Sequence, residues 1–184
     1  TNDAAVIVND PADTRRAVGS VFPAAQSHID EALETAVDAM WKWDQGGGAA
    51  RAACLERAAD LMEAKRSEFM ALCVREAGKC IPDALAEIRE AVDFCRYYAL
   101  QARKHFEQPL QLAGPTGESN QMSLHGRGVF ACISPWNFPL AIFTGQVVAA
   151  LAAGNAVVAK PAEQTPLIAA LAVELLHEAG VPST

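Results

Sequence analysis

The sequence predicts an α/β fold in which a helical layer precedes a Rossmann-type parallel sheet. Val129–Ile133 and Ala156–Lys160 are short apolar runs rich in β-branched and small residues, as buried strands are. A segment with apolar residues at helical spacing follows each of them. This βαβα order requires a parallel sheet covered by helices. Ligands of such sheets bind beyond the carboxyl ends of the strands, where residues 134–138 and 160–163 lie.

Turn and capping residues give the limits of the two helices in this unit. Pro139 suits the first turn of a helix, whose apolar residues recur every three or four positions until Gly154 ends it. After the second strand, Thr165 is a typical N-cap and Pro166 a typical first helical residue. The second helix is therefore predicted over about 167–179.

Residues 1–113 are predicted to be mainly helical. A turn-rich stretch at 9–13 precedes a short run at 17–22 that suits an edge strand. Apolar spacing then predicts four helices, at about 27–45, 49–65, 67–78 and 83–106. Residues 109–120 are predicted to be a loop, and 121–125 alternates weakly as a strand. The glycines at 46–48 have no preceding strand and no following G-K-[ST], which favours a turn over a phosphate-binding loop.

Composition limits the classes of partner. The 184 residues are 51% hydrophobic and carry a net charge of −7, which fits one globular domain or a piece of one and argues against a nucleic-acid site. No apolar run approaches the roughly 20 residues of a membrane helix, and residues 1–13 lack a signal-peptide pattern. We therefore expect a cytoplasmic protein without a membrane segment.

Cysteine and histidine spacing predicts no metal site. The five cysteines include no C-x-x-C pair, and no histidine has a metal-ligand spacing to another histidine or to a cysteine. Cys54, Cys73 and Cys95 fall at apolar helical positions, which favours a place in the core, and Cys132 falls inside the first predicted strand of the sheet.

Each polar residue at the strand ends has a structural and a functional interpretation. Asn137 follows the first strand and precedes a helix, so its amide either caps that helix or donates to an oxyanion. Trp136 and Phe138 beside it belong either to the core or to a substrate wall. Lys160 and Glu163 either reach a polar ligand over the sheet edge or form a solvated strand end.

Three motifs, in this order and at this spacing, resemble those of the aldehyde dehydrogenase superfamily: ISPWNFP at 133–139, AGN at 153–155 and KPAEQTP at 160–166. Three further stretches resemble the L-glutamate γ-semialdehyde (1-pyrroline-5-carboxylate) dehydrogenase module of the bifunctional proline utilization A (PutA) proteins: REAGK at 75–79, AEIREAVDFCRYYA at 86–99 and GPTGESN at 114–120. The resemblance covers nearly the whole chain.

The resemblance implies NAD-dependent oxidation of L-glutamate γ-semialdehyde, formed from 1-pyrroline-5-carboxylate, to glutamate in proline catabolism. In that family a cysteine thiolate attacks the aldehyde, an asparagine amide and a backbone N–H hold the oxyanion, hydride passes to NAD⁺, and a glutamate activates water. Asn137 matches the oxyanion asparagine. Phe138 matches an aromatic wall of the aldehyde tunnel, and Glu87 resembles a helix glutamate near the semialdehyde.

The resemblance also implies an NAD site. Lys160 and Glu163 match the residues that hold the adenosine ribose, and the carboxylate disfavours the 2′-phosphate of NADP. The positions that line the cofactor site are matched by Ile133, Ser134, Pro135 and Trp136. FAD is expected only in a separate proline dehydrogenase domain absent from this chain.

The family's nucleophilic cysteine and general-base glutamate lie beyond residue 184. We therefore expect an incomplete NAD-binding domain that is inactive alone and belongs to a longer, homo-oligomeric protein. Its parts are a helical layer (1–113), a loop with an oligomerisation strand (114–127) and the first βαβα unit (128–184). Two alternatives remain open: another NAD-dependent aldehyde dehydrogenase, for example for succinic semialdehyde or betaine aldehyde, and a non-catalytic folding or oligomerisation module.

Overall fold

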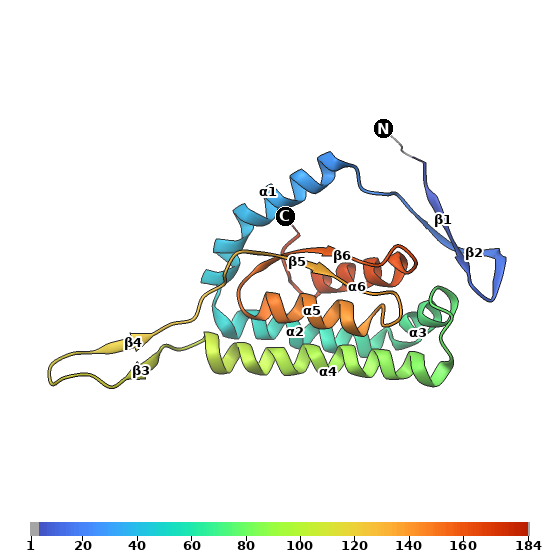
Figure 1. Cartoon of the computed structure of the whole chain (residues 1–184). Coiled ribbons are helices and arrows are strands. Elements are labelled where there is room, and N and C mark those ends of the chain that lie inside the picture. The colour runs from blue at the N-terminus through green and yellow to red at the C-terminus, as the bar shows by residue number, and fades with distance from the viewer. Residues whose placement is uncertain (1–3, 184) are drawn as a thin grey trace.

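The computed structural model describes residues 4–183 and has a parallel pair of strands at its centre. These are β5 (Val129–Ile133) and β6 (Ala156–Lys160). Helix α5 (Ala141–Ala152) connects them, and α6 (Pro166–Glu178) follows β6. In Figure 1 the strands lie between α1 (Gln26–Gln45), above them, and α5, below. The predicted βαβα order and the bounds of both strands are confirmed.

Three helices form the layer beneath this unit (Figure 1). They are α2 (Gly47–Ala64), α3 (Arg66–Arg75) and α4 (Ile81–Phe106), and α4 runs along both α2 and α5. Their packing buries one continuous apolar core, and each fully buried large side chain contributes on the order of 1.5–3 kcal/mol. The largest members include Leu55, Met62, Phe69, Ile88 and Phe143. Together with α1, these are the four helices predicted before residue 113, and their ends differ from the predicted ones by a few residues.

The first strands form an antiparallel hairpin. β1 (Val6–Asp10) pairs with β2 (Asp13–Val21) across a turn at residues 11 and 12. The predicted edge strand at 17–22 is therefore confirmed, although it begins earlier, and β1 was not predicted. Because most of both strands is exposed, their residues show little of the alternation between apolar and polar side chains that marks a half-buried strand.

A second hairpin projects from the body of the molecule as an arm (Figure 1). It is built from β3 (Leu110–Leu112) and β4 (Asn120–Met122), which pair antiparallel. The prediction that 109–120 is entirely loop was wrong, because β3 lies within it. The strand predicted at 121–125 is present only to Met122. Strands of three residues are too short to leave a periodic pattern in the sequence.

The apolar face of α1 is not buried as its helical spacing suggests. Ala36 is buried, but Ile29, Leu33, Val37 and Trp41 are exposed among the residues that the structure describes. Within residues 4–183, moreover, no helix combines the length and apolarity needed to cross a membrane.

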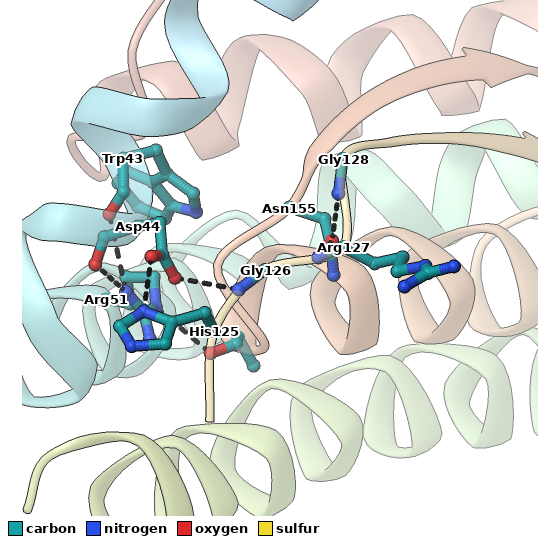
Figure 2. A network of polar contacts seen from close by, with 9 residues as sticks. Trp43, Asp44, Arg51, His125, Gly126, Arg127, Gly128 and Asn155 are labelled. Atoms are coloured by element: carbon teal, nitrogen blue, oxygen red, sulfur yellow. Dashed lines mark hydrogen bonds and ion pairs between the residues drawn. The ribbon is translucent and has the colours of Figure 1, made fainter. Parts of the chain in front are cut away.

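A polar network joins the end of α1 to the root of the arm (Figure 2). The buried Asp44 carboxylate lies 2.8 Å from His125 Nδ1 and accepts the Gly126 N–H at 2.8 Å. The equally buried Arg51 guanidinium donates to the carbonyls of Trp43, Asp44 and Ala152. Burial lowers the pKa of Arg51, because the cation has lost solvent. These bonds fix the chain where it leaves the arm and enters the sheet.

Asn155, the residue before β6, completes this junction (Figure 2). Its Oδ1 accepts the N–H groups of Arg127 and Gly128, and its Nδ2 donates to the Ala150 carbonyl at 3.1 Å. The preceding Gly154 has a φ of +90°, and a Cβ there would collide with Asp44 Oδ1. The AGN motif therefore sets the relative position of the starts of β5 and β6, and through them the ends that carry the candidate site.

Candidate functional site

The carboxyl ends of β5 and β6 bring the two predicted site segments together. Ile133 lies opposite Lys160 in the parallel register, and the Ser134 N–H donates to the Lys160 carbonyl at 3.2 Å. Residues 134–138 and 160–163 therefore leave the sheet from one edge, side by side. This is the edge at which parallel sheets bind ligands.

Most of the predicted site residues are open to solvent. Trp136 is 55% exposed and Phe138 is 41% exposed, so this aromatic pair does not belong to the core. Ser134 is buried and Pro135 is half-buried, whereas the other predicted residues of the two segments are exposed: Ile133, Asn137, Lys160 and Glu163. The two segments thus form a surface of aromatic, apolar and polar side chains.

Asn137 does not cap the helix that follows it. The first amides of α5, those of Leu140 and Ala141, donate to Glu87 Oε2 at 3.2 and 2.8 Å. Within residues 4–183 the Asn137 side chain makes no hydrogen bond, and the residue is exposed. Asn137 therefore does not cap α5, and its role as an oxyanion donor stays a prediction.

Glu87 lies behind the Asn137 segment rather than on the open surface. It extends from α4, is 1% exposed, and its Oε1 is 2.8 Å from Lys79 Nζ. The Lys79 ammonium also lies 4.5 Å from the centre of the Phe138 ring. The structure thus places Glu87 beside the N-terminus of α5, and its predicted contact with the semialdehyde stays a prediction.

A second carboxylate caps α6. Thr165 occupies the predicted N-cap position, but its hydroxyl makes no cap bond. Instead, the buried Glu76 carboxylate accepts the N–H groups of Leu167 at 2.6 Å and Ile168 at 2.9 Å. A charged acceptor that satisfies two amides outcompetes one hydroxyl. Burial raises the pKa of Glu76, and these two backbone hydrogen bonds oppose the rise.

Lys160 and Glu163 are the polar groups of the second segment. Both are exposed, and neither forms an ion pair within the part of the chain that is described. Glu163 Oε1 accepts a side-chain bond from the neighbouring Gln164 at 3.3 Å, which leaves its second oxygen open. An ammonium and a carboxylate placed three residues apart offer both a donor and an acceptor to a polyhydroxylated ligand.

Four of the five cysteines occupy core positions, and Cys80 is exposed. Cys54, Cys73, Cys95 and Cys132 are buried, as their sequence positions predict. Burial raises the pKa of Cys73 and Cys95 to about 12 and also raises that of Cys132, so their thiols stay protonated at neutral pH. Across residues 4–183 no three metal-ligating side chains lie together.

One hollow among the described residues lies away from this edge. Its volume is about 550 Å³, and it lies between α1 and the β6–α6 side, lined by side chains such as Trp43, Val158 and Leu176. None of the predicted site residues lines it. The candidate site is thus an open surface in this chain.

Sequence reasoning did not single out Lys79 or Glu76 as parts of the site. The signal was indirect: α5 begins after Leu140, which has no capping side chain, so its amides need an acceptor from elsewhere. Both residues lie in the REAGK stretch at 75–79, where the sequence reveals a resemblance but not a contact.

Comparisons with known proteins match a single family over the whole chain. The sequence model of the aldehyde dehydrogenase family matches residues 1–184. The chain is 50% identical over 175 residues to the bifunctional protein PutA of Escherichia coli K12, covering 95% of this chain and 12% of that protein. It is 41% identical over 180 residues to 1-pyrroline-5-carboxylate dehydrogenase 2 of Bacillus subtilis, covering 98% of this chain and 35% of that protein.

A solved structure of a similar protein has the same fold. The fold matches 1-pyrroline-5-carboxylate dehydrogenase from Thermus with bound NAD at a TM-score of 0.94 and 36% identity, over 99% of this chain and 35% of that one. The chain therefore spans about an eighth of the PutA protein and about a third of the two dehydrogenases.

Proposed function

Because this chain belongs to the aldehyde dehydrogenase family, we propose that it forms part of an NAD-dependent dehydrogenase of proline catabolism. The proposed reaction oxidises L-glutamate γ-semialdehyde, formed from 1-pyrroline-5-carboxylate, to glutamate. Its relatives named as PutA and as 1-pyrroline-5-carboxylate dehydrogenase support this substrate. The nucleophilic cysteine and the general-base glutamate would come from outside residues 1–184, so we expect the segment alone to form no NADH.

The observation that carries the proposal is the exposed, unbonded amide of Asn137 at the carboxyl edge of the sheet. An amide donates a hydrogen bond without ionising, and a fixed donor aimed at a developing oxyanion stabilises the transition state by about 3 kcal/mol. In the proposed role, the Asn137 amide binds the oxygen of the attacked aldehyde. Phe138 beside it forms a wall for the aldehyde, and Glu87 stays a proposed neighbour of the semialdehyde.

The residues present fit an NAD site. Ile133 and Trp136 are exposed apolar surfaces at the end of β5, suited to contact with a flat heterocycle, and Ser134 and Pro135 would shape the floor beneath it. Lys160 and Glu163 would bind the ribose hydroxyls. When bound, NAD⁺ accepts the hydride. FAD is proposed only for a separate proline dehydrogenase domain, outside this chain.

The arm supports an oligomeric protein. Its strands expose Leu110, Leu112 and Met122. Exposed apolar side chains on a two-stranded edge favour pairing with another polypeptide. We propose that the arm, which consists of β3, β4 and the loop between them and overlaps residues 114–127, is the oligomerisation element of a cytoplasmic homo-oligomer.

Asn137→Ala in the protein that contains this chain tests the proposal. The wild type should form NADH from 1-pyrroline-5-carboxylate, and the variant should lose about 100- to 1,000-fold in kcat with little change in the KM for NAD⁺. Asn9→Ala, at an exposed position on β1, is the matched control and should retain wild-type kinetics. A wild type that forms no NADH, or an Asn137→Ala variant that keeps its kcat, would contradict the proposed function.

A further inference from the structure

We propose that Lys79 is a positioning residue that holds the Asn137 segment in place through Glu87 and Phe138. We call the contacts of Lys79 with Glu87 and Phe138 the clamp. The clamp itself rests on geometry alone, and its effect on catalysis rests on the proposed function. Among the described residues the Lys79 ammonium contacts Glu87 and Phe138, so its proposed role is to act through these two side chains.

Backbone hydrogen bonds fix the main chain around Lys79 independently of its side-chain contacts. It follows α3, where Gly78 adopts a φ of +68° and donates to the Val74 carbonyl at 3.1 Å. The Lys79 N–H donates to the Cys73 carbonyl, also at 3.1 Å. These two bonds close the C-terminus of α3, a termination that a left-handed glycine permits. The Lys79 side chain therefore leaves from a rigid point and is only 14% exposed.

The Lys79 ammonium contacts two partners, Glu87 on α4 and Phe138 in the segment after β5. Its Nζ lies 2.8 Å from Glu87 Oε1, and 4.5 Å from the centre of the Phe138 ring. A cation over a ring face is attracted by the ring quadrupole, and the attraction grows as the cation loses solvent. Lys79 thus binds directly to the residue next to Asn137.

The second route to Asn137 runs through the start of α5. The other oxygen of Glu87 accepts the N–H groups of Leu140 and Ala141 at 3.2 and 2.8 Å. Because Glu87 is buried, its charge requires a partner, and Lys79 is the cation that faces it. Removing the ammonium leaves a buried carboxylate unpaired and loosens its hold on the helix start. Asn137 is thereby fixed from Phe138 and from residues 140–141.

The chain offers a matched pair for comparison. Lys65 and Glu178 also form an ion pair of 2.8 Å, but their side chains are 37% and 50% exposed, and Glu178 lies at the far end of α6 from the site. Lys65→Met removes the same kind of contact as Lys79→Met without touching the Asn137 segment. Lys79→Arg keeps a cation at the position.

Two measurements on the full-length protein test the clamp. Hydrogen–deuterium exchange of peptides that cover residues 138–142 should accelerate in Lys79→Met and remain at the wild-type rate in Lys65→Met. With 1-pyrroline-5-carboxylate, kcat should fall roughly 10- to 100-fold in Lys79→Met, with the KM for NAD⁺ unchanged. In Lys79→Arg, both the exchange rate and kcat should return toward the wild-type values.

Unchanged exchange at 138–142 in Lys79→Met would overturn the clamp. So would a loss of kcat that Lys65→Met shares, or one that merely follows a lower thermal midpoint in both variants. If the wild type proves inactive on the aldehyde, the proposed function fails, while faster exchange in Lys79→Met alone would still establish the clamp.

Discussion

At the residue scale, two buried carboxylates hold the helices that follow the sheet strands. Glu87 binds the first amides of α5, and Glu76 binds those of α6. Glu76 directly follows α3, and Glu87 lies near the start of α4. Each helix start therefore takes its cap from a distant segment, and these two carboxylates position the loops that carry Asn137 and Glu163.

Glu76 should make stability depend on pH. Its pKa is raised above the ordinary value of 4.5 in the folded chain, chiefly by burial. A raised folded pKa means that folding favours the protonated acid. The contribution of Glu76 to the free energy of unfolding is therefore complete below pH 4.5 and is lost as pH rises through the folded pKa. Relative to Glu76→Gln, which does not titrate, the wild type should lose stability over this window.

Urea midpoints of the two proteins, measured from pH 4 to 8, check this prediction. Glu118→Gln, at an exposed position in the loop of the arm, is the control and should follow the wild-type profile. If the difference between wild type and Glu76→Gln stays constant over the range, or grows in favour of the wild type as pH rises, the account of Glu76 is wrong.

At the element scale, the arm has the clearest consequence for assembly. Leu112 on β3 is 46% exposed, and a charge there would oppose pairing of the arm with another copy. Leu112→Glu should therefore shift the protein from oligomer toward smaller species, as measured by light scattering after gel filtration. Leu33→Glu on α1, which is 44% exposed, should leave the mass unchanged. A Leu112→Glu protein of wild-type mass would contradict the proposed role of the arm.

The elements differ in how well their sequence predicts them. β5 and β6 were predicted with their observed bounds, because both are continuous apolar runs between turn residues. The sequence pattern also predicted that these strands are buried, but among the described residues β5 is mostly exposed and β6 is largely half-buried. β1 and β3 were not, because exposed or three-residue strands carry no such pattern. Helical spacing predicted α1 correctly, but spacing does not say what covers a face, and Val37 and Trp41 are exposed.

At the scale of the whole molecule, the sheet topology could be predicted from the sequence, and with it the edge that carries the candidate site. The side-chain hydrogen bonds at that edge could not be predicted. The register of two parallel strands is enough to place residues 134–138 beside 160–163. Whether Asn137 caps α5 or faces a ligand depends on Glu87, fifty residues away in the sequence, and local pattern carries no information about such a contact. For the same reason the role of Lys79 becomes visible only in the folded chain.

Substrate preference tests the central claim most directly. NADH formation by the full-length protein would be measured with 1-pyrroline-5-carboxylate, succinic semialdehyde and a simple aliphatic aldehyde. The proposed function predicts a kcat/KM at least about 100-fold higher for 1-pyrroline-5-carboxylate, or about 2.7 kcal/mol in transition-state free energy. Equal or reversed preference would contradict the assignment to proline catabolism, although the chain would remain a member of the aldehyde dehydrogenase family.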